Sequence, residues 1–231
     1  RNIAWKAAEI VRKKFNINTG VKIIISKRIP VAAGLAGGSA NAAAVLKGLN
    51  CLWGLGMDDQ EMREIGKELG ADVPFCIKGG SSLARGIGEK LTPFEVKRPI
   101  WLLVVNPPIR VSTRKIFNLW GERSMLAVKR PDAARMIEAL SSGDIRRVAD
   151  SMGNVLELVT ASIYPEILEL KQELIGCGAL NSVMSGSGPS VYGVFEDRLK
   201  AQQAAELLKK GLKGRFFVTS TSDKGIECLG E

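Results

Sequence analysis

The segment Pro30-Val-Ala-Ala-Gly-Leu-Ala-Gly-Gly-Ser-Ala40 is the most informative stretch of this 231-residue sequence. It lies between an apolar, alternating stretch at 21–29, which predicts a strand, and a helix-forming stretch at 41–52. Where a strand leads into a helix, backbone N–H groups and the positive end of the helix dipole can face an anion. Three glycines permit close backbone approach, so the segment predicts either a phosphate-binding loop or a tight packing turn.

Other nucleotide-binding loops are excluded by the same residues. The segment has no Gly-Lys-Ser/Thr ending, as a Walker A loop would, and no G-x-G-x-x-G spacing, as a dinucleotide fingerprint would. Ser39 offers a hydroxyl that could bind a phosphate or a Mg²⁺ ion.

The composition is that of a folded protein with one large or two small domains. Hydrophobic residues make up 45% and charged residues 25%, and the apolar runs are far shorter than the roughly 20 residues of a membrane span. The absence of histidine excludes histidine zinc sites and Ser-His-Asp triads. The four cysteines are Cys51, Cys76, Cys177 and Cys228, and they form no C-x-x-C pair. We expect them to be buried thiols in a reducing cytoplasm rather than a disulfide framework.

The net charge of +9 comes from 33 Lys and Arg against 24 Asp and Glu. Such a charge can attract nucleic acid, a membrane surface or a small anion. The basic residues are scattered, and their densest groups, at 12–14 and 209–210, have no interleaved aromatic residues. We therefore expect an anionic small-molecule partner, with neither nucleic acid nor a membrane as partner.

Hydrophobic spacing predicts helices and strands without a regular alternation, which indicates an α+β protein. Helices are predicted at 2–15, 41–52, 58–70, 113–120, 131–140, 144–158, 165–174 and 199–210. Strands are predicted at 21–29, 100–106, 181–185, 191–195 and 215–220, with a short extended segment at 71–77. Asp58-x-x-Glu61 has the form of a capping box, and a second unit is predicted to begin near Pro99.

Together with the glycine segment, five further stretches resemble the GHMP kinase superfamily of galactokinase, homoserine kinase, mevalonate kinase and phosphomevalonate kinase. They are Asn41-Ala-Ala-Ala44, Leu49-Asn-Cys-Leu-Trp53, Leu69-Gly-Ala-Asp-Val-Pro-Phe75, Gly86-Ile-Gly-Glu89 and Met184-Ser-Gly-Ser-Gly-Pro-Ser190. The resemblance runs from Asn2 to the last predicted strand. It implies a two-domain α+β fold, with a domain like the second domain of ribosomal protein S5 at 1–98 and a ferredoxin-like domain at 99–231.

Within the superfamily, the motifs are most similar to those of the member that phosphorylates the 2-hydroxyl of a cytidine diphosphate-linked methylerythritol in non-mevalonate isoprenoid biosynthesis. The resemblance implies ATP and Mg²⁺ as cofactors and a cytoplasmic monomer or homodimer. Two alternatives stay open: another GHMP kinase, of the homoserine or mevalonate type, and a GHMP-fold protein that holds nucleotide without turnover.

The resemblance also implies roles for individual residues. Asp72 matches the catalytic aspartate, which accepts the proton of the substrate hydroxyl, although aspartate in such a place is also a common helix or turn cap. Lys27 would lie against the adenine, or be a solvated lysine at a strand end, and Asn2 would lie beside the base, or be a plain helix cap. The remaining residues implied for ATP are Pro30, Val31, Ala32, Ala33, Gly34, Leu35, Ala36, Gly37, Gly38, Ser39 and Ala40, with Ser39 also the candidate for the metal.

The substrate side is implied to include Phe117, stacked on the cytosine, with Thr113 nearby. Each has an alternative, because an amphipathic helix needs a core phenylalanine and a threonine can serve as its N-cap. The second glycine stretch is implied to contact substrate or phosphate, or to be a simple hairpin turn, through Gly186, Ser187 and Gly188.

The family pattern begins upstream of Arg1, with a strand that carries a catalytic lysine and a hairpin with a Tyr-His pair. We therefore expect this sequence to be part of a longer protein, which leaves open whether the chain alone is active. Ala40 and Asn41, where many members carry Ser and Asp, are mild variants.

Overall fold

The computed structural model describes residues 2–123 and 130–227, and it divides into two compact units. Unit 1 comprises residues 2–31, 36–94 and 222–227, and unit 2 comprises residues 32–35, 95–123 and 130–221. The glycine segment therefore leaves unit 1 after Val31, contributes four residues to unit 2 and returns at Ala36. The domain boundaries 1–98 and 99–231 stay a prediction.

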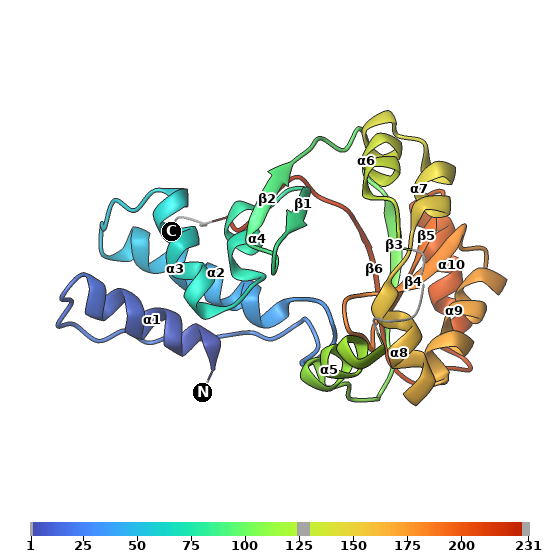
Figure 1. Cartoon of the computed structure of the whole chain (residues 1–231), viewed down its shortest axis with the longest axis horizontal. Helices are drawn as coiled ribbons and strands as arrows, with labels where there is room; N and C mark the ends of the chain where they lie inside the picture. Colours follow the sequence, from blue (N-terminus) through green and yellow to red (C-terminus); the bar gives the residue numbers. More distant parts are fainter. Residues whose placement is uncertain (1, 124–129, 228–231) are drawn as a thin grey trace. The chain divides into compact units, whose positions relative to one another are not determined.

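Unit 1 is built from helices and one hairpin (Figure 1). Helices α1 and α2 pack against each other through small, fully buried side chains, including Ala7, Ala42 and Ala43, which let the two backbones approach closely. Helix α4 also packs on α2, and β1 pairs antiparallel with β2. The elements are α1 (Ile3–Lys14), α2 (Gly37–Leu52), α3 (Asp59–Leu69), α4 (Val73–Lys78), β1 (Ser82–Arg85) and β2 (Lys90–Pro93).

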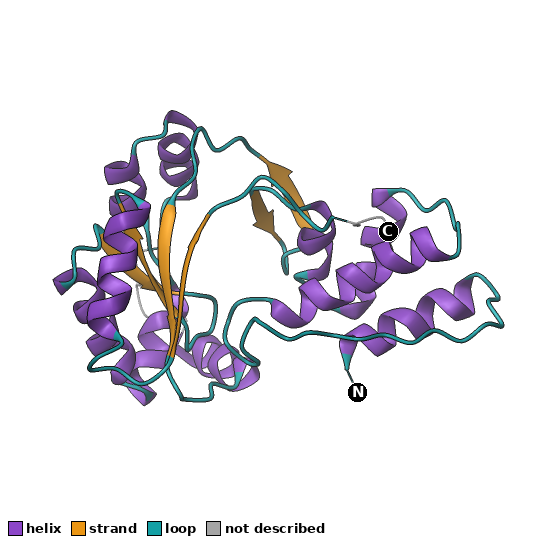
Figure 2. Cartoon of the chain, turned by 180° about the vertical axis from the view of Figure 1, so that it is seen from behind, coloured by secondary structure: helices purple, strands orange, loops and turns teal. Residues whose placement is uncertain are grey.

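Unit 2 contains an antiparallel four-stranded sheet with the order β4-β5-β3-β6. Helices α9 and α10 pack on this sheet, as Figure 2 shows in purple and orange. Leu103 and Phe195, on the inner strands β3 and β5, are fully buried in the core that results. The strands are β3 (Trp101–Asn106), β4 (Asn181–Met184), β5 (Val191–Phe195) and β6 (Arg215–Ser220). The helices are α5 (Thr113–Arg123), α6 (Ala133–Ser142), α7 (Ile145–Ser151), α8 (Val155–Ile163), α9 (Glu166–Gly176) and α10 (Arg198–Leu208).

The order of elements in unit 2 is that of a ferredoxin-like fold. Strand β3 is followed by helices, then by β4, β5, α10 and β6 in turn. If the four strands are numbered by their order in the chain, their order across the sheet is 2-3-1-4. This is the arrangement of a split βαβ unit. The predicted α+β class is confirmed, as is each of the four strands predicted in this unit, within one residue at either end.

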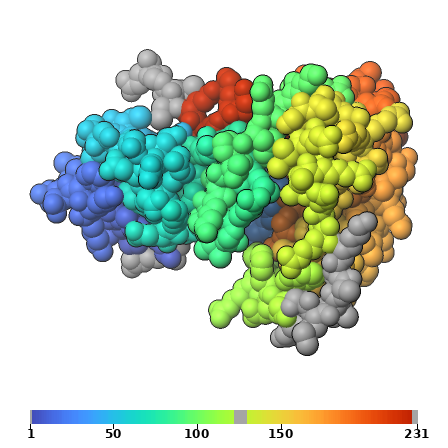
Figure 3. All heavy atoms as spheres, turned by 45° about the horizontal axis from the view of Figure 1, so that its top comes forward, coloured from blue at the N-terminus to red at the C-terminus, as the bar shows by residue number. Residues whose placement is uncertain are grey.

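Polar caps fix where many helices begin. The predicted capping box is confirmed: the side chain of Asp58 accepts from the Glu61 N–H at 2.7 Å, and Glu61 accepts in return from the Asp58 N–H. Side chains that precede α6, α7, α8 and α10 make equivalent bonds to first-turn amides, and they are Asp132, Asp144, Asn154 and Asp197. Helices α6 and α7, coloured yellow, lie at the surface in Figure 3.

Three predicted elements are wrong. Residues 21–26 alternate in burial as expected and 27–29 are exposed, but the segment forms no strand, because no described strand pairs with it. The segment 71–77, expected to be extended, instead enters α4, because Pro74 lies in the first turn, where its missing N–H is not needed. The single helix predicted at 144–158 is two helices, since Met152 is extended and Asn154 caps a new start.

Two further observations bear on the composition. None of the described helices has the length and apolar character to cross a bilayer. The expectation of buried thiols is wrong for Cys51, which is exposed, whereas Cys76 and Cys177 are half-buried and Cys228 lies outside the described residues.

Candidate active site

Helix α2 begins inside the glycine segment, four residues earlier than predicted. Its first helical hydrogen bond runs from the Ala40 N–H to the carbonyl of Ala36 at 2.9 Å. The N–H groups of Gly37, Gly38 and Ser39 therefore project from the helix end, where the dipole is positive. The geometry is the one that the phosphate-loop interpretation requires. Ala36 itself holds a left-handed backbone, with φ of 47°, which is strained for a residue with a side chain.

Gly37 is needed for packing within the protein. A Cβ built on it would lie 2.7 Å from Ile29 Cγ2 and 2.9 Å from Lys27 Nζ. The Lys27 ammonium donates to the Gly37 carbonyl at 2.7 Å. Lys27 is therefore tied to the start of α2, although its side chain is exposed, as the solvated-lysine alternative expected; its place against the adenine stays a prediction.

Gly38 is open by comparison. It is exposed, and a Cβ built on it would make only an ordinary contact, 3.7 Å from Ile3 Cγ2. Ile3 also borders Gly70, whose built Cβ would lie 3.6 Å from Ile3 Cδ1. The Ile3 side chain thus lies beside both the start of α2 and Gly70, two residues before Asp72. Asn2, next to Ile3, caps α1 by accepting from the Ala4 N–H at 3.0 Å, as its helix-cap alternative expected.

Asp72 occupies the residue before α4, yet its side chain makes no capping hydrogen bond. The carboxylate is exposed, and the turn that holds it ends at Val73, whose N–H donates to the Gly70 carbonyl at 3.1 Å. Burial, and secondarily the negative charge of Asp72, raise the pKa of the Cys76 thiol, one turn along α4, to about 11. The capping alternative for Asp72 is therefore wrong, and its carboxylate is available for chemistry.

The first part of the glycine segment contacts the second glycine stretch, and both belong to unit 2. Ser185 Oγ donates to the Gly34 carbonyl at 2.8 Å, and the Ser190 N–H donates to the Ala33 carbonyl at 3.3 Å. Gly34 has φ of 70°, and a Cβ built on it would lie 2.2 Å from the Ser185 carbonyl oxygen. The two glycine motifs, 151 residues apart, are thus joined directly.

The second glycine stretch, residues 185–190, is also the hairpin turn between β4 and β5, which we call the glycine turn. Its Ser187 hydroxyl lies 2.8 Å from Thr113 Oγ1, so two residues implied for the substrate side are brought together. The alternative role of Thr113, as the N-cap of α5, is wrong, because α5 begins at Thr113 itself. Ser112 takes that place, with its Oγ 3.4 Å from the Lys115 N–H that donates to it.

Phe117 lies on the same face of α5 as Thr113, one turn further on. Its side chain is 55% exposed, so the alternative of a core phenylalanine is wrong. Ile116 takes the core position instead and is 1% exposed. An exposed ring beside Thr113 is suited to stacking on a flat ligand.

Two residues that hold the glycine turn were missed by sequence reasoning. Asn154 Nδ2 donates to the carbonyls of Met184 and Gly186, at 2.8 and 2.7 Å. The fully buried Thr160 donates through Oγ1 to the Ser187 carbonyl at 3.2 Å. Asn154 falls inside the helix predicted at 144–158, so the sequence pattern gave no signal for its role.

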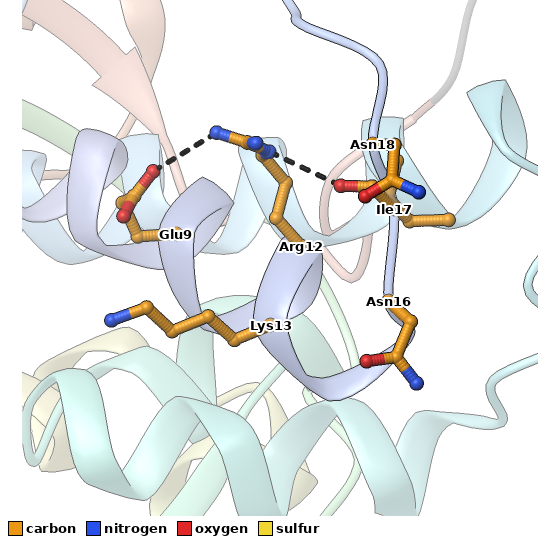
Figure 4. Close-up of a pocket in the computed structure, with 6 residues that line it drawn as sticks. All are labelled: Glu9, Arg12, Lys13, Asn16, Ile17 and Asn18. Carbon is orange, nitrogen blue, oxygen red and sulfur yellow. Dashed lines mark hydrogen bonds and ion pairs between the residues drawn. The ribbon is translucent and has the colours of Figure 1, made fainter.

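A surface hollow of about 530 Å³ lies at the end of α1 (Figure 4). None of the residues implied for the site lines it; its lining is Glu9, Arg12, Lys13, Asn16, Ile17 and Asn18. Arg12 there is already engaged by Glu9 and by the Ile17 carbonyl. Among the described residues, no cluster of three or more Cys, Asp or Glu side chains could hold a metal ion.

Two family models match the chain, one in each half. The model of the GHMP kinases N terminal domain matches residues 2–80, and that of the GHMP kinases C terminal domain matches residues 136–214. The chain is 47% identical over 231 residues to the 4-diphosphocytidyl-2-C-methyl-D-erythritol kinase of Clostridioides difficile (100% of this chain, 77% of that protein). It is 48% identical over 220 residues to the kinase of the same name from Acetivibrio thermocellus (95% and 77%).

Solved structures agree with these matches. A crystal structure of 4-(cytidine 5'-diphospho)-2C-methyl-D-erythritol kinase superimposes with a TM-score of 0.80 at 31% identity, covering 96% of this chain and 79% of that one. A homoserine kinase from Cytophaga hutchinsonii superimposes with a TM-score of 0.78 at 20% identity (97% and 77%), which shows a shared fold alone. With both family models matched and relatives this similar along its whole length, the chain belongs to the GHMP kinases.

Proposed function

We propose that this kinase transfers the γ-phosphate of ATP to the 2-hydroxyl of 4-diphosphocytidyl-2-C-methyl-D-erythritol. The observation that carries the proposal is the arrangement in unit 1, where Ile3 lies beside both the open helix end at Gly38 and Gly70, two residues before Asp72. Relatives that are 46–48% identical to this chain are named as kinases of this acceptor, which supports the choice. A cytoplasmic monomer or homodimer is part of the proposal.

The start of α2 would hold the ATP phosphates. Three projecting N–H groups, at Gly37, Gly38 and Ser39, are hydrogen-bond donors for phosphate oxygens, and the helix dipole favours their negative charge. In phosphoryl transfer, such positioning and charge stabilisation supply most of the rate enhancement. Lys27 supports this end by its bond to Gly37, and Asn2, which caps α1, is the residue before Ile3.

Asp72 would act as the general base. The acceptor hydroxyl oxygen attacks the γ-phosphorus, the bond from that phosphorus to the bridging oxygen of ADP breaks, and the hydroxyl proton passes to the Asp72 carboxylate. The carboxylate is suited to this role because it is exposed and makes no capping bond in α4.

Mg²⁺ fits the donor chemistry of this region. In such sites it is bound by few protein oxygens together with the phosphates, and the hydroxyl of Ser39, in the first turn of α2, is an oxygen donor of that kind. When bound, the ion would neutralise negative charge on the transferring phosphoryl group.

The acceptor would be held by unit 2 residues. Phe117 presents an exposed ring for the cytosine, and the exposed Thr113, one turn earlier, presents a hydroxyl that is bonded to the buried Ser187 hydroxyl. Gly186 is exposed and would let the glycine turn approach the ligand closely, whereas Gly188 is buried and serves packing, since a Cβ built on it would lie 2.6 Å from Met184 Sδ. The net charge of +9 favours the encounter with two anionic substrates.

The test is an acceptor panel with Mg-ATP. The chain is incubated with 4-diphosphocytidyl-2-C-methyl-D-erythritol, homoserine or mevalonate, and phosphorylated product is identified by ³¹P NMR and mass spectrometry. We expect product from the first acceptor alone, and none from the Asp72→Asn variant above the background. Product from homoserine or mevalonate instead would replace the proposed acceptor, and ATP binding without turnover on any acceptor would favour a nucleotide-holding protein.

A further inference from the structure

Strand β4 lies at the edge of the unit 2 sheet, and the first turn of α8 covers the outer side of its end. Both backbone groups of Met184, the last residue of β4, are bound by α8 side chains. Its N–H donates to Glu157 Oε2 at 2.8 Å, and its carbonyl accepts from Asn154 Nδ2 at 2.8 Å. Glu157 is itself paired with Lys171, with both side chains largely buried. At this end of the edge strand, side chains therefore make the backbone hydrogen bonds that a neighbouring strand would otherwise make.

The grip of α8 continues into the glycine turn. The second N–H of the Asn154 amide donates to the Gly186 carbonyl at 2.7 Å, and Thr160 donates to the carbonyl of Ser187. Asn154 Oδ1 meanwhile accepts from the Leu156 N–H at 3.0 Å, capping α8. One half-buried side chain thus uses its acceptor for the helix, one donor for the end of β4 and the other donor for the glycine turn.

This pattern fixes the direction of a backbone donor. In a trans peptide the N–H is antiparallel to the preceding carbonyl, and the Gly186–Ser187 peptide is trans. Because the Gly186 carbonyl is held toward Asn154, the Ser187 N–H must point the opposite way, and among the described residues none accepts from it. Ser187 also carries the hydroxyl that meets Thr113.

Ser187 is 5% exposed, and its hydroxyl reaches the start of α5, which carries positive charge. Arg114 and Lys115 follow Thr113, are exposed, and occupy a first helical turn that holds no acidic residue. Cations in a first turn oppose the helix dipole, which makes this end attractive to an anion.

We propose that Asn154 is a positioning residue, which holds the glycine turn so that the Ser187 N–H donates to an anionic oxygen of the acceptor substrate. Asn154 does not touch the substrate; it acts through the turn. The inference rests on the proposed function for its kinetic readout, but its structural part can be measured without turnover.

The test uses Asn154→Ser, which keeps a capping hydroxyl for α8 and removes the donors to the Met184 and Gly186 carbonyls. The matched control is Asp197→Ser, because Asp197 also caps a helix of unit 2 through one backbone bond, to Lys200 N–H at 2.8 Å. Asn154→Asp is the second variant, since it keeps the size and the capping acceptor but turns a carboxylate oxygen toward two carbonyls.

The first readout is amide hydrogen exchange at Ser185 and Gly188, whose N–H groups bond to the Ser190 and Ser185 carbonyls within the turn. We expect exchange to quicken at least about tenfold in both Asn154 variants and to stay unchanged in the control. The second readout is kinetic: KM for the acceptor should rise at least about tenfold, while KM for ATP changes less than about threefold.

Unchanged exchange at both amides would overturn the inference, whatever the activity. Quickened exchange with an unchanged acceptor KM would overturn the role of the turn in binding. If the unaltered chain phosphorylates no acceptor, the proposed function fails separately, and the exchange rates still decide whether Asn154 positions the turn.

Discussion

Gly34 and Gly38 stand four residues apart in one motif, yet they meet opposite surroundings. A side chain at Gly34 would collide with the Ser185 carbonyl oxygen at 2.2 Å, and the residue needs φ of 70°. A side chain at Gly38 would find ordinary space beside Ile3, at 3.7 Å. Contacts within the protein therefore require glycine at position 34, whereas no contact within the protein requires it at position 38. The motif therefore has an anchored part, residues 32–35, held by the glycine turn, and an open part at Gly38, in the first turn of α2.

The largest effect we expect concerns the chemistry that the open part would serve. Asp72→Asn should lower kcat at least about a hundredfold, the usual scale for the loss of a general base. The dissociation constant for ATP and the melting temperature should change little, because the carboxylate makes no capping bond. Steady-state kinetics, calorimetric ATP titration and thermal unfolding measure these three quantities, and near-normal turnover would remove Asp72 from the mechanism.

Gly34→Ala tests the anchored part. A left-handed backbone costs a residue with a side chain about 1–2 kcal/mol, and overpacking against a backbone oxygen adds about 1–3 kcal/mol. We expect the free energy of unfolding to fall by about 2–5 kcal/mol, measured by urea denaturation. Gly48→Ala is the matched control, because nothing lies within 4 Å of a Cβ built there. A Gly34→Ala protein as stable as the control would show that the anchoring contact is dispensable.

A smaller effect reports the charge of Asp72 without turnover. Its charge contributes to the raised pKa of Cys76, about 11, although burial contributes more. A like charge disfavours the thiolate, so Asp72→Asn should shift the pH profile of Cys76 alkylation to lower pH. The gain in rate at a fixed pH below 11 should be less than about tenfold, since one pKa unit corresponds to tenfold. Peptide mass spectrometry follows Cys76, with the exposed Cys51 as internal reference; an unmoved profile would place the carboxylate elsewhere.

Local signals in the sequence predicted much of the fold. The capping box at Asp58 and the strand at 215–220 depend on residues near in sequence, and both are confirmed. The error at 21–29 arises because alternation predicts a half-buried extended chain, whereas a strand also needs a hydrogen-bonded partner. The break within 144–158 depends on Asn154 serving both a helix and a distant turn, which no local pattern contains.

The residues of the candidate site could be predicted from the sequence, but the different roles of its glycines could not. The motifs identified the glycine segment, Asp72 and the glycine turn. They could not indicate that Gly34 serves packing while Gly38 stays open, because that difference depends on Ser185, 151 residues away. The exposure of Phe117 likewise follows from Ile116 taking the core position on α5.

The open part of the motif is tested most directly by the ATP affinity of Gly38→Ala. Replacing glycine by alanine within a helix favours folding by up to about 1 kcal/mol, and the added methyl group fits the protein. The same methyl group would obstruct the approach of a phosphate to the helix end. We predict an unchanged or raised melting temperature with a dissociation constant for ATP at least about tenfold higher, the cost of one hydrogen bond to a charged group. Unaltered ATP affinity in a stable Gly38→Ala protein would contradict the account and reduce the glycine segment to a packing turn.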